Sequence, residues 1–179
     1  MELAHKLRSY AGTLPGGGVT FSGGEPLMQA NFVAAVCDEL PDMHKALQTS
    51  GYADSAMFQA LARRMDYILF DLKLADPVAH KQYTGRSNDS ILQNFVWLKT
   101  SGISYVVRIP LIPGITDTQE NLTALAGLTR DCQVELAPYN PLAGAKYPMV
   151  NRLLLYEVAT KNEVDISLFE RSTSVDILS

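Results

Sequence analysis

The sequence is poor in cysteine, with only Cys37 and Cys132 among 179 residues. This content excludes a scaffold built on disulfides and is typical of proteins that work in a reducing compartment. Cys37 falls on an apolar helical stripe, where a buried core thiol is the expected role. We therefore predict a cytoplasmic location.

Basic runs and long apolar runs are also missing. The 15 Lys and Arg are outnumbered by 19 Asp and Glu, which gives a formal net charge of -4. Without a basic patch, a nucleic-acid surface is not expected. No apolar stretch approaches the roughly 18 residues of a membrane span, and residues 1–10 are too polar for a signal peptide. Nucleic acid and membrane are therefore not predicted partners.

The length suits one domain with its own core and is too short for a complete eight-unit barrel of about 250 residues. We predict a single domain over residues 1–179. Residues 1–15 are expected to be the end of a helix and a loop, residues 16–147 to hold five β/α units, and residues 148–179 to form a divergent tail. A helix is expected near the C-terminus of this tail.

Strand and helix periods alternate strictly along the chain. The predicted strands are residues 19–22, 45–49, 67–73, 105–112 and 133–138. The predicted helices are residues 2–11, 32–40, 55–64, 88–100 and 121–130, the last with a cap at Thr116 or Asp117 and Glu120 in a capping box. This alternation predicts an α/β fold with a parallel sheet, either doubly wound or part of a barrel.

The most informative segment is Gly-Gly-Val-Thr-Phe-Ser-Gly-Gly-Glu-Pro at residues 17–26. A short apolar strand runs directly into paired glycines, which have no Cβ and let a ligand lie against the backbone. Thr20 and Ser22 fall on one face of this strand, and Pro26 suits the first turn of the helix that follows. An ordinary strand-to-helix turn explains the glycines equally well.

The other strands also end in polar residues, at the edge of the sheet where α/β proteins bind ligands. Buried charges are costly unless they are paired or bind a ligand. Asp71 and Lys73 share a strand face, so a structural ion pair is one interpretation and a ligand site is the other. Arg108, within an apolar strand, is either a core arginine satisfied by a carboxylate or a site residue.

Six segments then occur in a characteristic order and spacing. They are residues 16–27, 48–52 (Gln-Thr-Ser-Gly-Tyr), 70–73 (Phe-Asp-Leu-Lys), 80–85, 108–114 and 138–140 with 146–147. Together they resemble the radical S-adenosylmethionine (SAM) superfamily, and more closely the activating enzymes of glycyl-radical enzymes, the pyruvate formate-lyase activating enzyme type. The resemblance implies a partial (β/α)6 TIM-like barrel of parallel strands that lacks the first β/α unit.

The resemblance also implies roles for individual residues. The residues implied in SAM binding are Thr20, Ser22, Gly23, Gly24, Glu25, Thr49, Asp71, Lys73, Arg108, Tyr139 and Asn140, of which Lys73 and Arg108 would be catalytic. A monovalent cation is implied near Gln48, Thr49, Leu69 and Asp71. Two positions depart from the family pattern, with Gln48 in place of an aspartate and Asn140 in place of a histidine. Residues 80–85 resemble a segment near the peptide-substrate groove, and an exposed loop is the alternative.

The implied chemistry is reductive cleavage of SAM by a [4Fe-4S] cluster, followed by hydrogen abstraction from a glycine of a partner glycyl-radical enzyme similar to pyruvate formate-lyase. A flavodoxin or ferredoxin-type protein would supply the electron. The family holds its cluster with three cysteines in a Cys-x3-Cys-x2-Cys loop, which this sequence lacks, and Cys37 and Cys132 lie on different elements. We therefore expect an inactive fragment of a longer enzyme, with the cluster in the full-length protein only.

Two other functions are considered. One is a cluster-free module that binds SAM or the partner without radical chemistry. The other is an unrelated aldolase-like or phosphate-binding α/β protein that uses the glycine loop at a helix N-terminus. Glu25 weighs against the second, because a carboxylate in the loop would repel phosphate.

Overall fold

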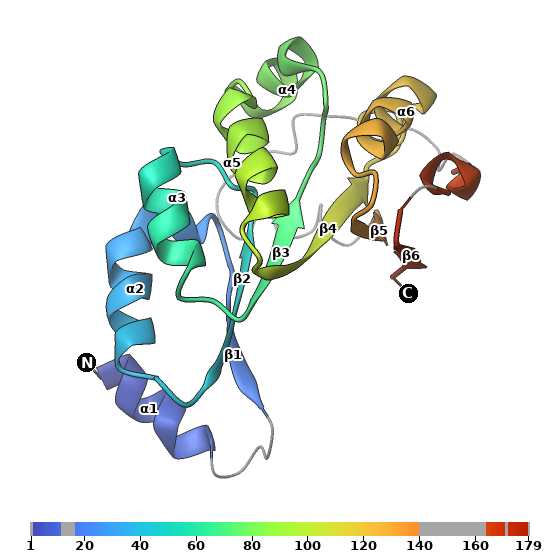
Figure 1. The fold of residues 1–179 in the computed structure, drawn as a ribbon. Coiled ribbons are helices and arrows are strands. Elements are labelled where there is room, and N and C mark those ends of the chain that lie inside the picture. The colour runs from blue at the N-terminus through green and yellow to red at the C-terminus, as the bar shows by residue number, and fades with distance from the viewer. Residues whose placement is uncertain (1, 12–16, 140–163, 171, 179) are drawn as a thin grey trace.

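Each strand of the sheet lies beside the strand that follows it in the chain, and all of them run parallel (Figure 1). The computed structural model describes residues 2–11, 17–139, 164–170 and 172–178. The strands are β1 (Gly18–Phe21), β2 (His44–Thr49), β3 (Tyr67–Asp71), β4 (Ser104–Leu111), β5 (Gln133–Pro138) and β6 (Ser174–Ile177). The described sheet is open, which confirms the predicted parallel α/β fold of a partial barrel.

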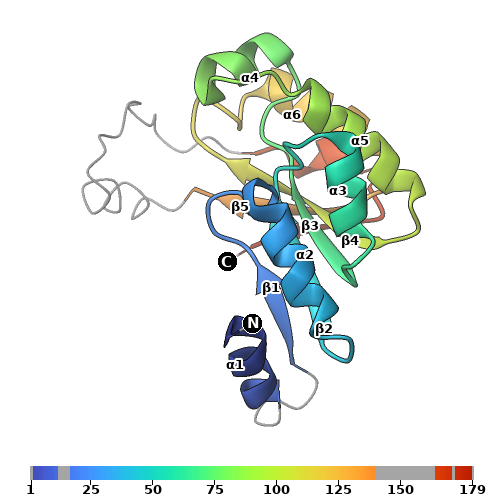
Figure 2. The same cartoon turned by 90° about the vertical axis from the view of Figure 1, so that its left-hand side faces the viewer.

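Helices cover one face of this sheet, as the two perpendicular views agree (Figures 1 and 2). The helical elements are α1 (Glu2–Ala11), η1 (Pro26–Gln29), α2 (Ala30–Asp38), α3 (Ser55–Ala62), α4 (Pro77–Thr84), α5 (Asp89–Thr100), α6 (Gln119–Leu128) and η4 (Ile166–Phe169). Right-handed crossovers between neighbouring parallel strands place successive helices on the same side. Helix α1 packs separately, with Ala4 against Val36 and Leu40.

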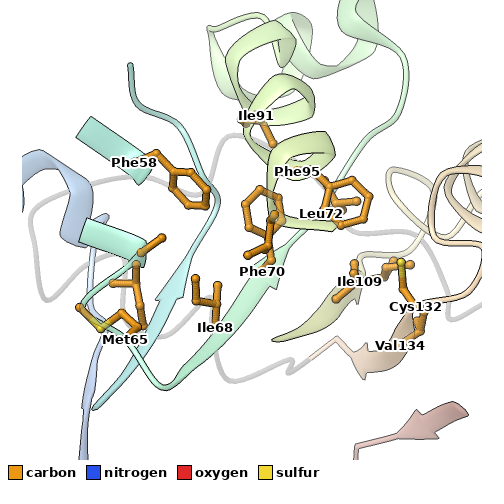
Figure 3. Close-up of a cluster of buried hydrophobic side chains, with 14 of the residues drawn as sticks. Phe58, Met65, Ile68, Phe70, Leu72, Ile91, Phe95, Ile109, Cys132 and Val134 are labelled. Carbon is orange, nitrogen blue, oxygen red and sulfur yellow. The ribbon is translucent and has the colours of Figure 1, made fainter. Parts of the chain in front are cut away.

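The core lies between the helices and the sheet, and Figure 3 shows its aromatic centre. Phe70 of β3 is fully buried. Its ring meets Phe58 of α3 edge-on at 5.9 Å and stacks on Phe95 of α5 at 5.4 Å, both measured between ring centroids. Aromatic pairs in these geometries add about 0.5–1.5 kcal/mol each beyond the burial of their area. The core thus anchors β3, whose carboxyl end carries Asp71.

The opposite face of the sheet carries charged residues among apolar ones. Strand side chains alternate between faces, and in β3 the buried Ile68 and Phe70 alternate with the half-buried Tyr67, Leu69 and Asp71. The register places Arg108 of β4 beside Asp71, and Glu135 of β5 beside Arg108. A row of charges therefore crosses the face that the described helices leave uncovered.

The tail differs from the prediction. A helix was expected near the C-terminus, but Ser174–Ile177 forms strand β6 in parallel pairing with β5. Val175, half-buried, packs against the main core, and Phe169 of η4 is buried in it. The described end of the tail therefore adds a sixth strand to the five that were predicted, because one apolar strand face was enough to extend the sheet.

Residues 80–85 do not form an exposed loop. They belong mostly to α4, which begins at the Asp76 cap, where the carboxylate accepts a hydrogen bond from the Ala79 N–H at 2.7 Å. The helix ends at Gly85, which has a left-handed φ of 78°. His80 is buried, with its Nδ1 2.7 Å from the Arg86 carbonyl oxygen. The exposed-loop interpretation is therefore wrong.

The predicted cap of the sixth helix is also wrong. Thr118 caps α6 by accepting from the Asn121 N–H at 3.3 Å, so Glu120 stands one residue too early for a capping box. Thr116 and Asp117 instead close the preceding loop. The Thr116 hydroxyl accepts from the Ile112 N–H at 2.6 Å and donates to the Pro110 carbonyl, while Asp117 accepts from the Gly114 N–H at 2.7 Å.

A candidate ligand site at the carboxyl ends of the strands

A cavity of about 370 Å³ opens at the carboxyl ends of β1, β2 and β3. It is lined by Ser22, Gly23, Gly24, Glu25, Gln48, Thr49, Ser50, Asp71 and Lys73. Three loops separated in sequence meet here because parallel neighbours end at the same edge of the sheet. A small polar molecule therefore has one shared site among them.

Glu25 ties the first two of these loops together. One of its carboxylate oxygens, Oε1, accepts from the Thr49 hydroxyl at 2.5 Å and from the Leu27 N–H at 3.2 Å. The other, Oε2, accepts from the Ser50 hydroxyl at 2.6 Å and from the Ser50 N–H at 3.0 Å. Hydrogen bonds to a charged group are roughly twice as strong as neutral ones. Glu25 therefore shapes the cavity wall as well as bringing negative charge to it.

Paired glycines leave the floor of the cavity bare. Gly23 has a φ of 89°, which L side chains rarely adopt. A Cβ built on either Gly23 or Gly24 would meet no atom within 4 Å outside its own chain neighbours, so the space above this backbone is open. A ligand can approach the peptide groups directly here.

Asp71 and Lys73 bring opposite charges to the third loop. The Lys73 ammonium lies 3.6 Å from the Asp71 carboxylate, with side-chain exposures of 35% and 22%. Leu72 between them is buried in the core on the other side. The two charges are thus paired as the structural interpretation expects, and both also line the cavity as the ligand-site interpretation expects.

Arg108 stands outside the residues that line the cavity. Its Nε lies 3.1 Å from Glu135 Oε2 without the alignment of a hydrogen bond, so the contact is a bare ion pair. Burial raises the pKa of Tyr67, and the nearby Glu135 carboxylate raises it further. Arg108 therefore pairs its charge with a carboxylate on the open face of the sheet, beside Asp71 in register, while its buried Nε–H has no hydrogen-bond partner among the described residues.

The residues predicted to bind SAM or a cation fall into two groups, those that line the cavity and those that do not. Ser22, Gly23, Gly24, Glu25, Gln48, Thr49, Asp71 and Lys73 come together in the cavity. Thr20, Leu69, Arg108 and Tyr139 are not among its lining residues, and Asn140 lies outside the described residues. Ser50 also lines the cavity and was missed; its place directly after the strand-end Thr49 was the available signal.

The two thiols are not among the residues that line this cavity and belong to the core between helices and sheet. Cys37 and Cys132 are both buried and free, and Cys132 lies in the main core near Ile109 and Val134 (Figure 3). Burial raises the pKa of the Cys37 thiol above its ordinary value of 9.0. Cys132 Sγ is 3.4 Å from the Tyr105 hydroxyl.

We predict that both thiols of the folded chain react with a thiol reagent at least about a hundredfold more slowly than in the urea-unfolded chain, because both are buried from the reagent and, for Cys37, burial also disfavours the reactive thiolate. The unfolded chain is the control. Fast labelling of either thiol in the folded chain would contradict this.

The raised pKa of Cys37 also makes stability depend on pH, because the folded chain holds the thiol proton more tightly than the unfolded chain does. The stabilisation by the protonated Cys37 thiol is fully present below pH 9.0 and is lost as the pH rises through the raised pKa of the folded chain.

The protein family of this chain follows from its similarity to known families. The model of the radical SAM superfamily matches residues 2–126, most of the chain. The chain belongs to the radical SAM superfamily. Among the described residues of this radical SAM chain, no helix is long and apolar enough to cross a membrane.

Its curated relatives are activating enzymes. The isethionate sulfite-lyase activating enzyme of Nitratidesulfovibrio vulgaris is 39% identical over 143 residues, covering 76% of this chain and 47% of that protein. The 4-hydroxyphenylacetate decarboxylase activating enzyme of Clostridioides difficile is 34% identical over 157 residues, covering 83% and 49%. The trans-4-hydroxy-L-proline dehydratase activating enzyme of C. difficile is 38% identical over 144 residues, covering 75% and 47%. The radical SAM chain thus spans about half the length of these relatives.

Solved structures share the radical SAM fold. A domain of the pyruvate-formate lyase-activating enzyme from Bacteroides vulgatus superposes with a TM-score of 0.67 at 23% identity, covering 88% of this chain and 98% of that one. Streptococcus suis SuiB, solved with its precursor peptide SuiA, gives a TM-score of 0.69 at 15% identity, covering 99% and 42%. At these identities the likeness establishes the fold alone.

Radical SAM membership implies two cofactors, and the residues fit them differently. The bare Gly23 and Gly24 backbone and the Asp71–Lys73 pair fit a zwitterion such as the methionyl group of SAM. The described residues contain no group of three His, Cys, Asp or Glu able to hold a metal, and the two cysteines of the sequence are buried on different elements. Cluster iron needs thiolates gathered in space, so the residues of this chain do not fit a [4Fe-4S] cluster.

Proposed function

We propose that the cavity at the ends of β1, β2 and β3 binds SAM, and that this chain is the SAM-binding part of an activating enzyme for a glycyl-radical enzyme. The observation that carries the proposal is the meeting of an open glycine backbone and an ion pair in one cavity of a radical SAM chain. A SAM molecule carries an ammonium, a carboxylate and ribose hydroxyls, each of which has a complementary group here.

We assign each group a partner. The backbone of Gly23 and Gly24 would hold the methionyl ammonium, with the Glu25 charge favouring it. Lys73 would pair with the methionyl carboxylate, and Asp71 would accept from the ribose hydroxyls. When bound, SAM would supply a sulfonium carbon–sulfur bond for reductive cleavage, with the electron coming from a donor outside the residues of this chain.

Other residues have supporting roles in this proposal. Arg108, paired with Glu135 beside Asp71, would hold the charge balance of the open face next to the ligand. Tyr139, directly after β5, would flank the adenosyl group. The monovalent cation site near Gln48 and Asp71 would be weak, because the Gln48 amide brings an oxygen ligand without charge.

The proposal also includes a protein substrate, an electron donor and a cellular location. The family relatives support a glycyl-radical enzyme as protein substrate. We propose a partner similar to pyruvate formate-lyase, a flavodoxin or ferredoxin-type electron donor, and work in the cytoplasm. Cys37 and Cys132 do not provide the electron-transferring cluster, and we propose that it is held by cysteines outside these 179 residues.

Calorimetric titration of the chain with SAM tests the binding. We expect saturable binding with a Kd between about 10 μM and 1 mM, that is, about -4 to -7 kcal/mol. Lys73→Met should weaken it about tenfold, because the loss of a charge pair at a partly dry site costs on the order of 1–2 kcal/mol. Lys81→Met, an exposed lysine on α4, is the control with the same charge change.

Three outcomes would change the conclusion. Failure to saturate at about 10 mM SAM, or equal effects of the two lysine variants, would contradict the assignment of this cavity. Binding tighter than about 1 μM without any cluster would favour the alternative of a self-sufficient SAM-binding module. The buried cysteines are the observation that keeps this alternative open.

A further inference from the structure

Asn121 of α6 is buried, with 7% of its surface exposed, yet its amide is fully used by two loops. Its Nδ2 donates to the Lys73 carbonyl at 2.9 Å and to the Thr116 carbonyl at 2.8 Å. Its Oδ1 accepts from the Ala75 N–H at 2.9 Å. The Asn121 side chain therefore holds the backbone on both sides of Leu74 and connects it by a hydrogen bond to the loop after β4.

A second buried asparagine holds the same segment from another helix. Asn88, at the start of α5 and 1% exposed, donates to the Leu74 carbonyl at 3.0 Å and to the Ala75 carbonyl at 2.9 Å. Its Oδ1 is buried and has no hydrogen-bond partner among the described residues. An orphaned oxygen of this kind costs about 1–3 kcal/mol, so Asn88 occupies its position at a cost to stability.

All three carbonyls of residues 73–75 are thus held by side-chain amides, which replace the ladder partners lost where β3 ends at Asp71. Side-chain partners at this density fix a short irregular segment that would otherwise move freely. The segment begins with Lys73, whose ammonium lines the cavity. Its backbone position decides where that charge lies.

We propose that Asn121, supported by Asn88, is a positioning residue that holds Lys73 at the SAM cavity. The proposal rests on the function proposed above, because the ligand it concerns is SAM. Misplacing a ligand group by about 1 Å costs up to a hundredfold in well-built sites. Neither asparagine is among the residues that line the cavity, and the contact of Asn121 with a lining residue is its hydrogen bond to the Lys73 carbonyl.

A structural role alone is the competing interpretation, and the chain offers a matched control for it. Asn94 of α5 is fully buried and donates to the Gly51 and Ala53 carbonyls at 2.8 and 3.1 Å. Like Asn88 it has a buried Oδ1 without a described partner. It holds the loop after β2, next to Ser50 of the same cavity, and both of its amide hydrogen bonds go to that loop and none to residues 73–75.

The test compares Asn121→Leu with Asn94→Leu in the 179-residue chain. Both replace a buried amide with an apolar side chain of similar size, and both should lower stability. Two quantities are measured for each: SAM affinity by calorimetry, and amide hydrogen exchange of the peptide that spans residues 72–79. Asn121→Asp keeps the acceptor for the Ala75 N–H and serves as the second variant if Asn121→Leu does not fold.

We expect Asn121→Leu to weaken SAM binding between about tenfold and a hundredfold. Asn94→Leu releases the loop that carries Ser50 of the same cavity and should weaken binding as well, so hydrogen exchange of residues 73–76 is the measurement that separates the two variants. Exchange of residues 73–76 should speed up at least about tenfold in Asn121→Leu only. Asn121→Asp should show a smaller change of the same kind. Unchanged SAM affinity of Asn121→Leu, or exchange of residues 73–76 that is unchanged or equally fast in both leucine variants, would overturn the proposal.

The two proposals fail separately. If the unaltered chain does not bind SAM, the proposed function is contradicted and the positioning of Lys73 is still decided by hydrogen exchange. If the unaltered chain binds SAM and Asn121→Leu binds it equally well, the positioning role is overturned and the function stands.

Discussion

Glu25→Ala is expected to lower the free energy of unfolding by about 3 kcal/mol and to abolish measurable SAM binding. The Glu25 carboxylate accepts four hydrogen bonds, from Leu27, Thr49 and twice from Ser50. Alanine leaves these donors without their acceptor. Water reaching the half-buried site compensates for part of the loss, so the expected value is well below four full charged hydrogen bonds.

The measurement is urea unfolding combined with the SAM titration. Glu120→Ala, which removes an exposed carboxylate on α6, is the control and should change stability by less than about 0.5 kcal/mol. If Glu25→Ala kept normal stability and bound SAM normally, the carboxylate would not organise the cavity.

Gly51→Ala is expected to destabilise the chain by about 3 kcal/mol. A Cβ at Gly51 would lie closer than 3.0 Å to the ring of Phe70, and the residue has a φ of 73°. Phe70 is fully buried between two other aromatic rings, so it has little room to move away. The substitution therefore combines overpacking with backbone strain.

Gly102→Ala separates these two effects. Gly102 has a similar φ of 77°, but a Cβ there would meet no atom within 4 Å. Only the left-handed strain remains, which costs about 1 kcal/mol. Thermal or urea unfolding of both variants measures the difference; equal losses would show that the contact with Phe70 is not rigid.

Five of the strands were predictable because the signals are local. Apolar residues with period two mark β3 and β4, and the alternation with helices predicts a parallel sheet without deciding between a doubly wound and a barrel order. The barrel order was expected from the family resemblance alone. The strand β6 was missed because Ser174–Ile177 has a single half-buried apolar residue, Val175, and its pairing depends on the neighbouring edge of β5. Such an edge is a tertiary feature that periodicity does not contain.

The sequence contains start and stop signals for helix α4 that the prediction did not use. Asp76 followed by Pro77 is a start signal, and Gly85 is a stop signal. The interpretation as a loop gave more weight to the polar residues between them than to these caps. His80 explains the outcome, because its buried ring contacts the Arg86 carbonyl and turns a polar stretch into a packed helix.

The cavity was predictable from strand ends, but the bonds that build it were not. Paired glycines and the Asp71–Lys73 spacing place ligand-facing groups at one edge of a parallel sheet. The engagement of Glu25 with Thr49 and Ser50 depends on how two loops meet, which no spacing encodes. Asn121 is a further case, since an asparagine on an amphipathic helix gives no sign of which carbonyls it will hold.

The most direct measurement is a titration of the isotope-labelled chain with SAM, followed by backbone amide NMR. The largest shift changes should fall on Gly23, Gly24 and Lys73, with Ser50 close behind, and should saturate together. Residues that line the separate cavity between α4 and α6, such as Gln82 and Ala124, should not shift. Saturating changes centred on that second cavity, or no change at Gly23 and Gly24 at saturation, would contradict the assignment of the SAM site.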